Sequence, residues 1–432
     1  MSLNKTFALP RGTADILPEE SFLWEEIESK ARRICQSYGF REIRTPLYED
    51  VNLFKRSLGQ TSDVVNKQLL ELASHKDDEG YALRPEGTAS IVRSYLENSF
   101  DKKEALSKFF YMGPMFRGER PQRGRLRQFH QIGAEAIGPG SLSAFLDAEI
   151  ISLAMFLLES FGVKKAKLKI NSLGSKEDKE RISLWLREVF AADKALLCPD
   201  CQNRFERNVF RVLDCKNETC KGLVSRIVTK LPLSDEGTRY FECVQEALRM
   251  AGIDFEIAPH LVRGLDYYSH TVFEITAQGL GSQDAIGAGG RYSQLIHELG
   301  GNLKVDFGAI GFALGIERVL LAVQSSLNDP GFIDAYVVIL NKGEAFLKEA
   351  FKVSDYLRKA GFKVDLSYLE RPVKSQFSQA SKLNARFALI IGEDELASGK
   401  ISVKNMKTSE QELVDRGAVL DYLKKIASLR SQ

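Results

Sequence analysis

The chain has 432 residues, of which 44% are hydrophobic and 27% charged, and this composition excludes collagen-like and largely disordered proteins. Its length is enough for two or three domains of roughly 100–200 residues each. Lys and Arg number 60 and Asp and Glu 58, a net charge of +2, so any nucleic-acid-binding surface must be local rather than a property of the whole chain.

The sequence lacks the features of a membrane or secreted protein. The apolar run from Ile150 to Leu158 is broken by Ser152 and is shorter than the ~18 residues that a bilayer-spanning helix needs. The N-terminal segment MSLNKTFALPRG has no apolar stretch of the kind found in secretory signals. We therefore expect a cytoplasmic protein without a membrane partner, whose six cysteines stay reduced.

The first half of the chain predicts an antiparallel sheet with helices beside it. Residues 22–38 have apolar positions three and four apart and precede Gly39, which predicts an amphipathic helix. Pro46 interrupts the strand-like residues 40–50 and predicts an edge or a bend. Four further strands are predicted at 108–116, 128–138, 166–174 and 270–278. Strands with few alternating helices favour antiparallel pairing.

Two segments differ from this pattern. Residues 175–258 are mostly helical and charged, which predicts an insertion. Residues 324–333 have the composition of a linker. Beyond them, short apolar strands at 335–340, 363–369 and 386–395, with a helix at 343–360, predict a small α/β domain.

The predicted insertion contains four closely spaced cysteines. Cys198 and Cys201 form a C-x2-C pair, and Cys215 and Cys220 follow at a wider spacing. A tetrahedral zinc site uses four soft ligands on tight turns, so this pattern is compatible with zinc. Reduced, partly buried thiols in a helical segment are an equally good interpretation. Neither alternative implies a catalytic role.

An arginine-rich segment lies between two of the predicted strands. Residues 116–135 contain Arg117, Arg120, Arg123, Arg125 and Arg127 but only Glu119 as a carboxylate before the second strand. A guanidinium group can donate two parallel hydrogen bonds to the oxygens of one phosphate, so a polyphosphate or a nucleic-acid backbone is the natural partner. A solvated hairpin tip would be the alternative if these arginines stood alone.

Four other segments carry polar side chains beside turns: RPEGT at 84–88, VRGLDYYSHTVFE at 262–274, GAGGRY at 287–292 and FGAIGFALGIERVLL at 307–321. Each is a weak signal by itself. The glycine cluster allows a backbone to approach a ligand closely but lacks the spacing of a dinucleotide-binding motif.

Together and in this order, these segments resemble the class II aminoacyl-tRNA synthetases, and within them the histidyl-tRNA synthetase family. The three class II motifs correspond to GFREIRTPLYE with Pro46, the FRGE segment whose loop ends at Phe129, and GIERVLL with Arg318. VRGLDYYSHTVFE and GAGGRYSQLI resemble the histidine-specific signatures. The resemblance implies an α+β fold: an antiparallel-sheet catalytic domain over 1–325 with the helical insertion at about 175–258, and an α/β anticodon-binding domain over 334–425.

The implied reaction has two steps. L-Histidine and ATP give histidyl-adenylate and pyrophosphate, and the 3′-terminal adenosine of histidine tRNA then takes the acyl group and releases AMP. The substrate carboxylate is the nucleophile, so the protein supplies positioning and charge neutralisation. The resemblance also implies Mg²⁺ bound with ATP, a homodimer with Pro46 near its interface, and no metal ligands among the site residues.

The resemblance assigns roles to individual residues. Arg117 and Arg263 are the expected catalytic residues, on either side of the α-phosphate. The expected histidine-binding residues are Glu86, Gly87, Thr88, Arg117, Gln131, Glu135, Arg263, Tyr267 and Tyr268. The expected ATP-binding residues are Arg117, Glu119, Phe129 on the adenine and Arg318 on the γ-phosphate. Gln122, Arg123 and Arg125 are expected at the tRNA acceptor end, and Lys382, Arg386, Lys400, Lys404 and Lys407 at the anticodon side.

Two positions depart from the family pattern or vary within it. Ala288 stands where a glycine is more usual, and His270 is expected to be a surface or packing histidine. A non-catalytic relative, the regulatory subunit of ATP phosphoribosyltransferase, is the alternative function. Such relatives typically lack the C-terminal domain and the motif arginines, both of which this sequence has.

Overall fold

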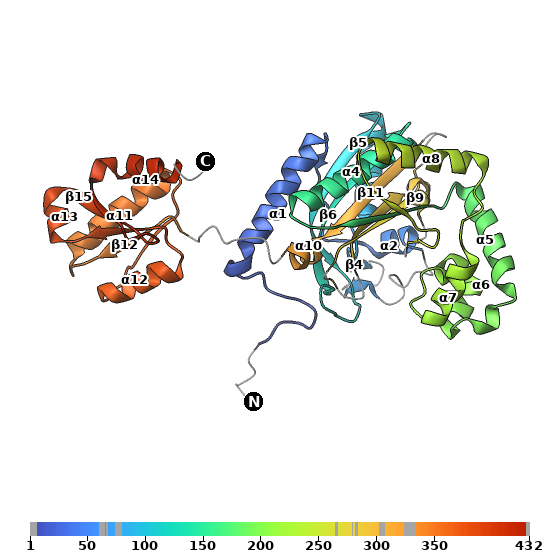
Figure 1. The fold of residues 1–432 in the computed structure, drawn as a ribbon, viewed down its shortest axis with the longest axis horizontal. Helices are drawn as coiled ribbons and strands as arrows, with labels where there is room; N and C mark the ends of the chain where they lie inside the picture. The colour runs from blue at the N-terminus through green and yellow to red at the C-terminus, as the bar shows by residue number, and fades with distance from the viewer. Residues whose placement is uncertain are drawn as a thin grey trace. The chain divides into compact units, whose positions relative to one another are not determined.

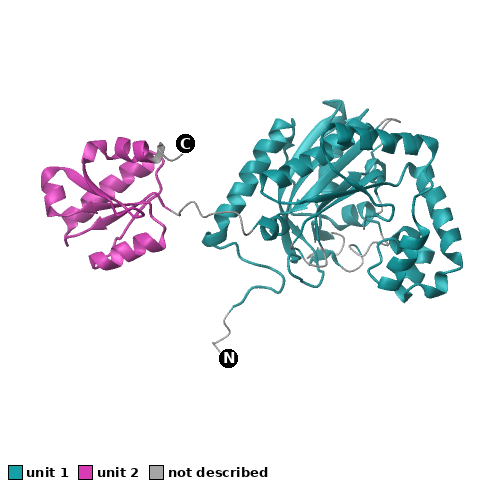
Figure 2. Cartoon of the chain, in the orientation of Figure 1, with its two compact units in different colours: residues 1–327 teal, residues 328–432 magenta. Residues whose placement is uncertain are grey.

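The computed structural model of the chain describes residues 7–59, 65, 68–73, 80–263, 267–278, 280, 284–301, 307–323 and 333–428. It divides into two compact units, Met1–Leu327 and Asn328–Gln432 (Figure 2). Of the linker predicted at 324–333, only Ile333 belongs to the described residues.

A large, mostly antiparallel sheet organises the first unit (Figure 1). Within the described residues its order is β1-β5-β6-β11-β10-β9-β7-β8, and only the outer pairs β1/β5 and β7/β8 are parallel. The strands are β1 Arg41–Glu42, β5 Ser107–Phe116, β6 Gln128–Pro139, β7 Lys167–Ser172, β8 Glu256–Ile257, β9 Ser269–Thr276, β10 Ala285–Arg291 and β11 Phe307–Gly315. The antiparallel sheet expected from the sequence is confirmed, and the glycine cluster forms the central strand β10.

Helices flank the sheet and fill the insertion. They are α1 Pro18–Ser37, α2 Val51–Ser57, α3 Thr88–Glu97, α4 Ala144–Ser160, α5 Lys176–Ala191, α6 Pro199–Arg207, α7 Glu218–Ile227, α8 Asp235–Met250, α9 Ser293–Glu298 and α10 Ile316–Val323. Helices α5 to α8 lie between β7 and β8 in the chain, so the segment predicted as a helical insertion is helical. Asp178 on α5 links the start of α5 to the start of α8. Its carboxylate accepts hydrogen bonds from the backbone amides of Ser175, which precedes α5, and Ser234, which precedes α8.

The two faces of the sheet have different neighbours because side chains alternate along each strand. On β6, Ile132, Ala134 and Ala136 point into a core shared with α1 and α4. Phe129, with Gln131 and Glu135 at alternate positions, belongs to the opposite face. One face is therefore packed by helices, and the other can present polar groups.

A buried ion pair fixes α4 to the end of β10. The carboxylate of Asp147 lies 2.6 Å from the guanidinium of Arg291, and both side chains are fully buried. Thr271 and Tyr240 donate hydroxyl hydrogen bonds to the same carboxylate, at 2.5 and 3.1 Å. Such pairs orient the elements they join, since breaking one leaves a buried charge without a partner.

Pro46 divides its strand-like segment, as the bend prediction required. Residues before it form β1, at the edge of the large sheet, and residues after it form β2, Tyr48–Asp50. Strand β2 belongs to a separate small sheet of order β2-β4-β3, with β3 Leu70–Leu72 and β4 Tyr81–Leu83.

The second unit is a small α/β domain with its own core. Among the described residues its sheet order is β13-β12-β14-β15-β16, parallel through β14 and antiparallel beyond it. Its elements are β12 Ala335–Ile339, α11 Glu344–Lys359, β13 Val364–Leu366, α12 Val373–Lys382, β14 Phe387–Ile391, α13 Glu393–Ser398, β15 Lys400–Asn405, β16 Gln411–Asp415 and α14 Val419–Ser428. In the described parts of both units, no helix combines the length and apolar character needed to cross a bilayer.

Candidate active site

A cavity of about 210 Å³ opens on the polar face of the large sheet. Eleven of the residues singled out from the sequence line it: Glu86, Thr88, Arg117, Glu119, Arg125, Phe129, Gln131, Arg263, Tyr267, Tyr268 and Arg318. They come from segments more than 200 residues apart in the chain. The fold therefore brings the separate sequence motifs to one place.

Small residues make room for this cavity. Across the central strands, Gly133 pairs with Ala313 and Gly311 pairs with both Glu135 and Gly290. A Cβ atom on Gly311 would lie 1.6 Å from Glu135 Oε2, and one on Gly133 would lie 2.3 Å from the ring of Tyr111. Glycine is required at both positions, because a larger residue would displace a side chain at the floor of the site.

Glu135 is the most deeply buried carboxylate of the site, with 1% of its surface exposed. Thr88 donates a hydroxyl hydrogen bond to Oε1 at 2.7 Å, and Tyr292 donates one to Oε2 at 2.6 Å. Burial raises the pKa of Glu135 to about 8, although both hydroxyl bonds act in the opposite direction. Without a ligand, this pKa favours the protonated form of Glu135 at neutral pH.

Glu86 and Thr88 lie at the start of α3. The Glu86 carboxylate accepts hydrogen bonds from the backbone amides of Thr88 at 2.7 Å and Ala89 at 2.9 Å, which caps the helix. Burial raises the pKa of Glu86, and the nearby Arg117 opposes that rise. Gly87 belongs to the same turn, and a Cβ there would lie 2.3 Å from the Tyr111 ring.

Arg117 lies at the end of β5 and faces the cavity. Its Nε donates to the Pro85 carbonyl at 3.0 Å, and its guanidinium lies 5.1 Å from the ring centre of Phe129. Burial lowers the pKa of Arg117. Glu119 follows in the hairpin loop, and Arg125 contacts its carboxylate at 3.5 Å. A cation stacked on an aromatic ring in this way is held ready for an anionic ligand.

The tip of this hairpin is exposed. Gln122 and Arg125 form reciprocal backbone hydrogen bonds of 3.0 and 2.9 Å, with Arg123 and Gly124 in the turn between them. The side chains of Gln122, Arg123 and Arg125 are all exposed. Gln122 and Arg123 lie outside the cavity lining, whereas Arg125 reaches it.

Two arginines approach from the other side of the cavity. Arg263 donates to Glu274 Oε2 on β9 at 2.7 Å, while its buried Nε has no hydrogen-bond partner among the described residues. Arg318 on α10 donates from Nε to the Ala285 carbonyl at 2.6 Å. Oxygen atoms of Glu274 on β9 and Ala285 on β10 thus help to position the two guanidinium groups.

Two further polar atoms of the cavity lack partners. The Oε1 atom of Gln131 and the hydroxyl of Tyr111 are buried, and neither has a hydrogen-bond partner in the part of the chain that the structure describes. Buried polar groups are nearly always hydrogen-bonded, so such atoms mark where a ligand supplies the missing partner.

Three tyrosines form one wall of the site. Tyr267 and Tyr268 lie 4.6 Å apart between ring centres, and Tyr267 meets Tyr292 edge to face at 5.9 Å. Tyr267 and Tyr268 are both buried, and both line the cavity. Burial raises the pKa of all three phenols.

Sequence reasoning missed Tyr111 and Tyr292 as site residues. The sequence marks Tyr292 only as a neighbour of the glycine cluster and Tyr111 only as a position in the strand predicted at 108–116. Tyr111 lies in register with Gly133, so a tyrosine paired with a glycine across the sheet was the available signal. His270 packs against Tyr240, 5.1 Å between ring centres, in agreement with a packing role. Ala288 lines the cavity at the floor.

Comparison with known proteins covers both units. A family model described as histidyl-tRNA synthetase matches residues 12–175 and 217–319. A second model, described as an anticodon-binding domain, matches residues 334–426. The first match is interrupted within the helical insertion, between residues 175 and 217.

Individual relatives match over nearly their whole length. The histidine–tRNA ligase of Moorella thermoacetica is 44% identical over 425 residues, which cover 96% of this chain and 98% of the relative. That of Geobacillus sp. is 45% identical over 427 residues, covering 97% and 99%. The crystal structure of apo S. aureus histidyl-tRNA synthetase matches with a TM-score of 0.79 at 35% identity, covering 97% of this chain and 100% of that one.

The buried carboxyl group predicts a pH-dependent stability difference. An ordinary glutamate has a pKa of about 4.3, so between pH 5 and 8 unfolding releases the proton that folded Glu135 retains. Wild-type stability should therefore fall with rising pH in this window relative to Glu135→Gln, by on the order of 4 kcal/mol, and level off above pH 8. Denaturant unfolding of both proteins at several pH values measures this difference.

The exposed Glu218→Gln serves as the matched control for loss of a glutamate carboxylate elsewhere in the same unit. A stability difference between wild type and Glu135→Gln that does not change with pH would contradict a raised pKa at Glu135.

Proposed function

The chain belongs to the histidyl-tRNA synthetase family and is a histidine–tRNA ligase; on this premise we propose how the cavity residues divide the work of the reaction. The observation that carries the assignment is the convergence of the motif arginines, Glu86 and the tyrosine pair on one cavity. Glu135 is not part of the cavity lining but lies directly behind it, hydrogen-bonded to the lining residues Thr88 and Tyr292. Histidine binds at the deep end, beside Glu135, and ATP binds toward the arginines.

The deep end is suited to an imidazole and an amino-acid head group. Neutral imidazole has one donor and one acceptor, and protonated Glu135 can both donate and accept. Glu135 and Tyr268 bracket the ring, with Tyr267 nearby, and Tyr292 holds the Glu135 carboxyl group in place. Glu86, Thr88 and Gln131, with Gly87 in the turn, bind the ammonium and carboxylate groups. The unpartnered Oε1 of Gln131 supports this assignment.

The arginines bind the phosphates. Arg117 contacts the α-phosphate, and Arg263 flanks it from the histidine side, so the substrate carboxylate can attack in line while pyrophosphate leaves. Arg318 binds the γ-phosphate, and Phe129 stacks on the adenine with its face away from Arg117. The stacked Arg117 and the unpartnered Nε of Arg263 support these roles. No protein nucleophile takes part.

Mg²⁺ accompanies the nucleotide. Glu119, which was not among the expected metal ligands, lines the cavity, and its carboxylate lies 3.5 Å from the guanidinium of the exposed Arg125. Hard cations prefer carboxylate oxygens, so Glu119 would hold Mg²⁺ together with phosphate oxygens of ATP. When bound, the ion neutralises charge on the outer phosphates.

The second step needs the tRNA at the hairpin tip and at the second unit. Gln122, Arg123 and Arg125 are exposed there and can position the acceptor end through its phosphates. In the second unit, Lys382, Arg386 and Lys407 are exposed, and Lys404 lies over the ring of Phe377 at 5.4 Å. These residues, with Lys400, form the anticodon-side backbone contacts.

The catalytic unit, residues 1–325, works as a homodimer. Leu47 and Tyr48 follow Pro46 and are 43% and 52% exposed, an apolar surface beside the first class II motif. A second copy of the chain would cover this apolar surface.

The proposed location is the cytoplasm, where the tRNA substrate is found.

The regulatory-subunit alternative has less support. A solved structure titled as an ATP phosphoribosyltransferase regulatory subunit/histidyl-tRNA synthetase, from Bacillus halodurans, has a TM-score of 0.64 at 22% identity, which shows a shared fold only. This chain has the anticodon-binding domain and the motif arginines, which such subunits typically lack.

Amino-acid-dependent ATP–pyrophosphate exchange tests the assignment. Histidine should support exchange, whereas other amino acids should not, because a site of buried polar partners rejects analogues that leave those partners unpaired. ATP binding without histidine-stimulated exchange would favour the regulatory-subunit function instead.

Replacing Arg263 distinguishes its effect on adenylate formation from its effect on histidine binding. Arg263→His should reduce histidyl-adenylate formation by about 10²–10³-fold, since a fixed charge opposite the phosphate is lost, while histidine binding changes little. Pre-steady-state adenylate formation and calorimetric histidine binding measure the two effects. The exposed Arg239→His on α8 is the control. Undiminished adenylate formation in Arg263→His would show that Arg263 does not contact the phosphate.

A further inference from the structure

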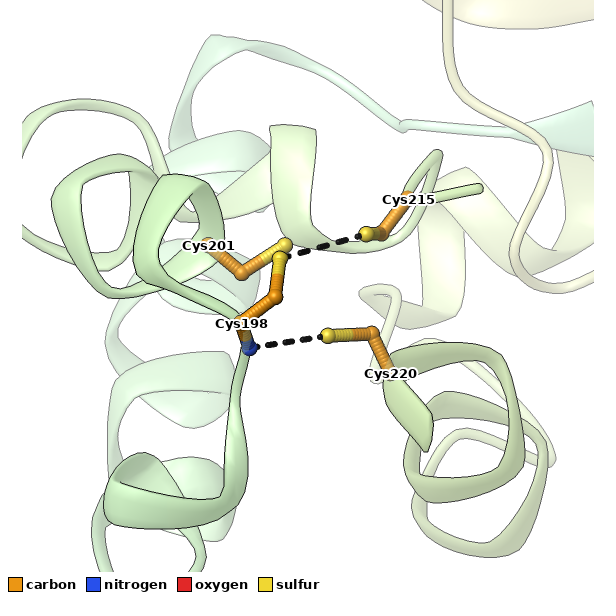
Figure 3. A group of neighbouring side chains, drawn as sticks. All are labelled: Cys198, Cys201, Cys215 and Cys220. Atoms are coloured by element: carbon orange, nitrogen blue, oxygen red, sulfur yellow. Dashed lines mark hydrogen bonds between the residues drawn. The ribbon is translucent and has the colours of Figure 1, made fainter. Parts of the chain in front are cut away.

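The four cysteines of the helical insertion come together in space. Cys198 immediately precedes α6, Cys201 lies in its first turn, Cys215 follows the short 3-10 helix Val209–Val212, and Cys220 lies in the first turn of α7. Their sulfur atoms all lie within 4.8 Å of one another, and three of the four side chains are buried. Figure 3 shows the four sulfur atoms turned toward one centre.

The spacing matches a single tetrahedral ion. Zinc–thiolate bonds of about 2.3 Å in a tetrahedron require sulfur–sulfur distances of about 3.8 Å. Cys198 and Cys215 have a separation of 3.8 Å between their Sγ atoms. An iron–sulfur cluster places iron and sulfide between its thiolates and would hold them farther apart.

The backbone around the cluster is arranged for thiolate charge. The Cys198 amide donates to Cys220 Sγ at 3.2 Å, and the Asn217 amide donates to Cys215 Sγ at 3.4 Å. The N-termini of α6 and α7 both meet the cluster, and helix N-termini favour negative charge. Hydrogen bonds of this kind orient metal ligands and offset part of the charge of a tetrathiolate site.

The cluster lies at the edge of a shared apolar core. Buried side chains of residues 194–228, among them Phe205, Val209 and Val212, pack in one core with Ile182 and Leu186 of α5. Cys201, Cys215 and Cys220 belong to the same core, so the four sulfur atoms are held together by packed elements. In a reducing compartment such thiols do not form disulfides, which leaves them available to a metal.

We propose that Cys198, Cys201, Cys215 and Cys220 bind one structural Zn²⁺ ion that fixes α6, the 3-10 helix and α7 as one unit. The ion has four protein ligands and no open position, so it takes no part in aminoacylation. Family membership does not assign this site, since the family match is interrupted before Cys198 and resumes after Cys215.

Metal analysis of the full-length protein tests this proposal. Protein purified without chelator should contain about one zinc ion per chain, and X-ray absorption should show four sulfur ligands at about 2.3 Å. Cobalt exchanged into the site should give the intense visible bands of tetrahedral tetrathiolate coordination. Cys201→Ser should lose at least tenfold in zinc content or affinity, whereas the exposed Cys243→Ser keeps wild-type zinc.

Each other outcome contradicts the proposal. Wild-type protein with less than about a tenth of an equivalent of zinc and no cobalt bands, iron with stoichiometric sulfide, or a disulfide among the four cysteines would each overturn it. Full zinc retention in Cys201→Ser would do the same. If Cys201→Ser does not fold, the cobalt spectrum and zinc content of the wild-type protein decide the question.

Discussion

The buried carboxyl group of Glu135 is the constraint on which the rest of the site depends. It lies on strand β6 and receives hydroxyl hydrogen bonds from Thr88, at the start of α3, and from Tyr292, which follows β10. Three elements that are distant in the chain therefore meet at one carboxyl group. Burial raises the pKa of that group to about 8, which favours the neutral carboxyl at physiological pH, and a neutral carboxyl can both donate to and accept from an imidazole.

Glycine residues in the sheet leave space for this carboxyl group and its neighbours. Gly311 faces Glu135 directly, and Gly133 and Gly87 make room for the ring of Tyr111. The opposite face of the same strands is packed by α1 and α4, and the Asp147–Arg291 pair holds α4 to the strand that precedes Tyr292. Packing on the apolar face thus keeps the opposite, polar face rigid. That polar face carries the buried polar atoms of Gln131 and Tyr111 that have no partner among the described residues. This arrangement is pre-organised for a ligand, because the cost of orienting its polar groups is met in folding.

The sequence predicts some of these features better than others. The antiparallel strands β5, β6 and β9 and the motif arginines follow from local patterns, namely alternation and charge density. Tyr111 and Tyr292 could not be assigned in that way, since their roles depend on cross-strand neighbours rather than on adjacent residues. The cysteine cluster illustrates the same limit. Its spacing left zinc and plain thiols equally open, and only the approach of α6 and α7 brings the four sulfur atoms to within 4.8 Å.

Calorimetric titration of histidine into Gly311→Ala tests the central role of Glu135 most directly. The added Cβ would lie 1.6 Å from Glu135 Oε2 and must displace the carboxyl group from Thr88 and Tyr292. Histidine affinity should fall about 100-fold or more, equivalent to about 2.7 kcal/mol, while Gly222→Ala on α7, where a Cβ meets no atom within 4 Å, binds as wild type. Wild-type affinity in a folded Gly311→Ala protein would contradict the account, because histidine recognition would then not depend on the position of Glu135.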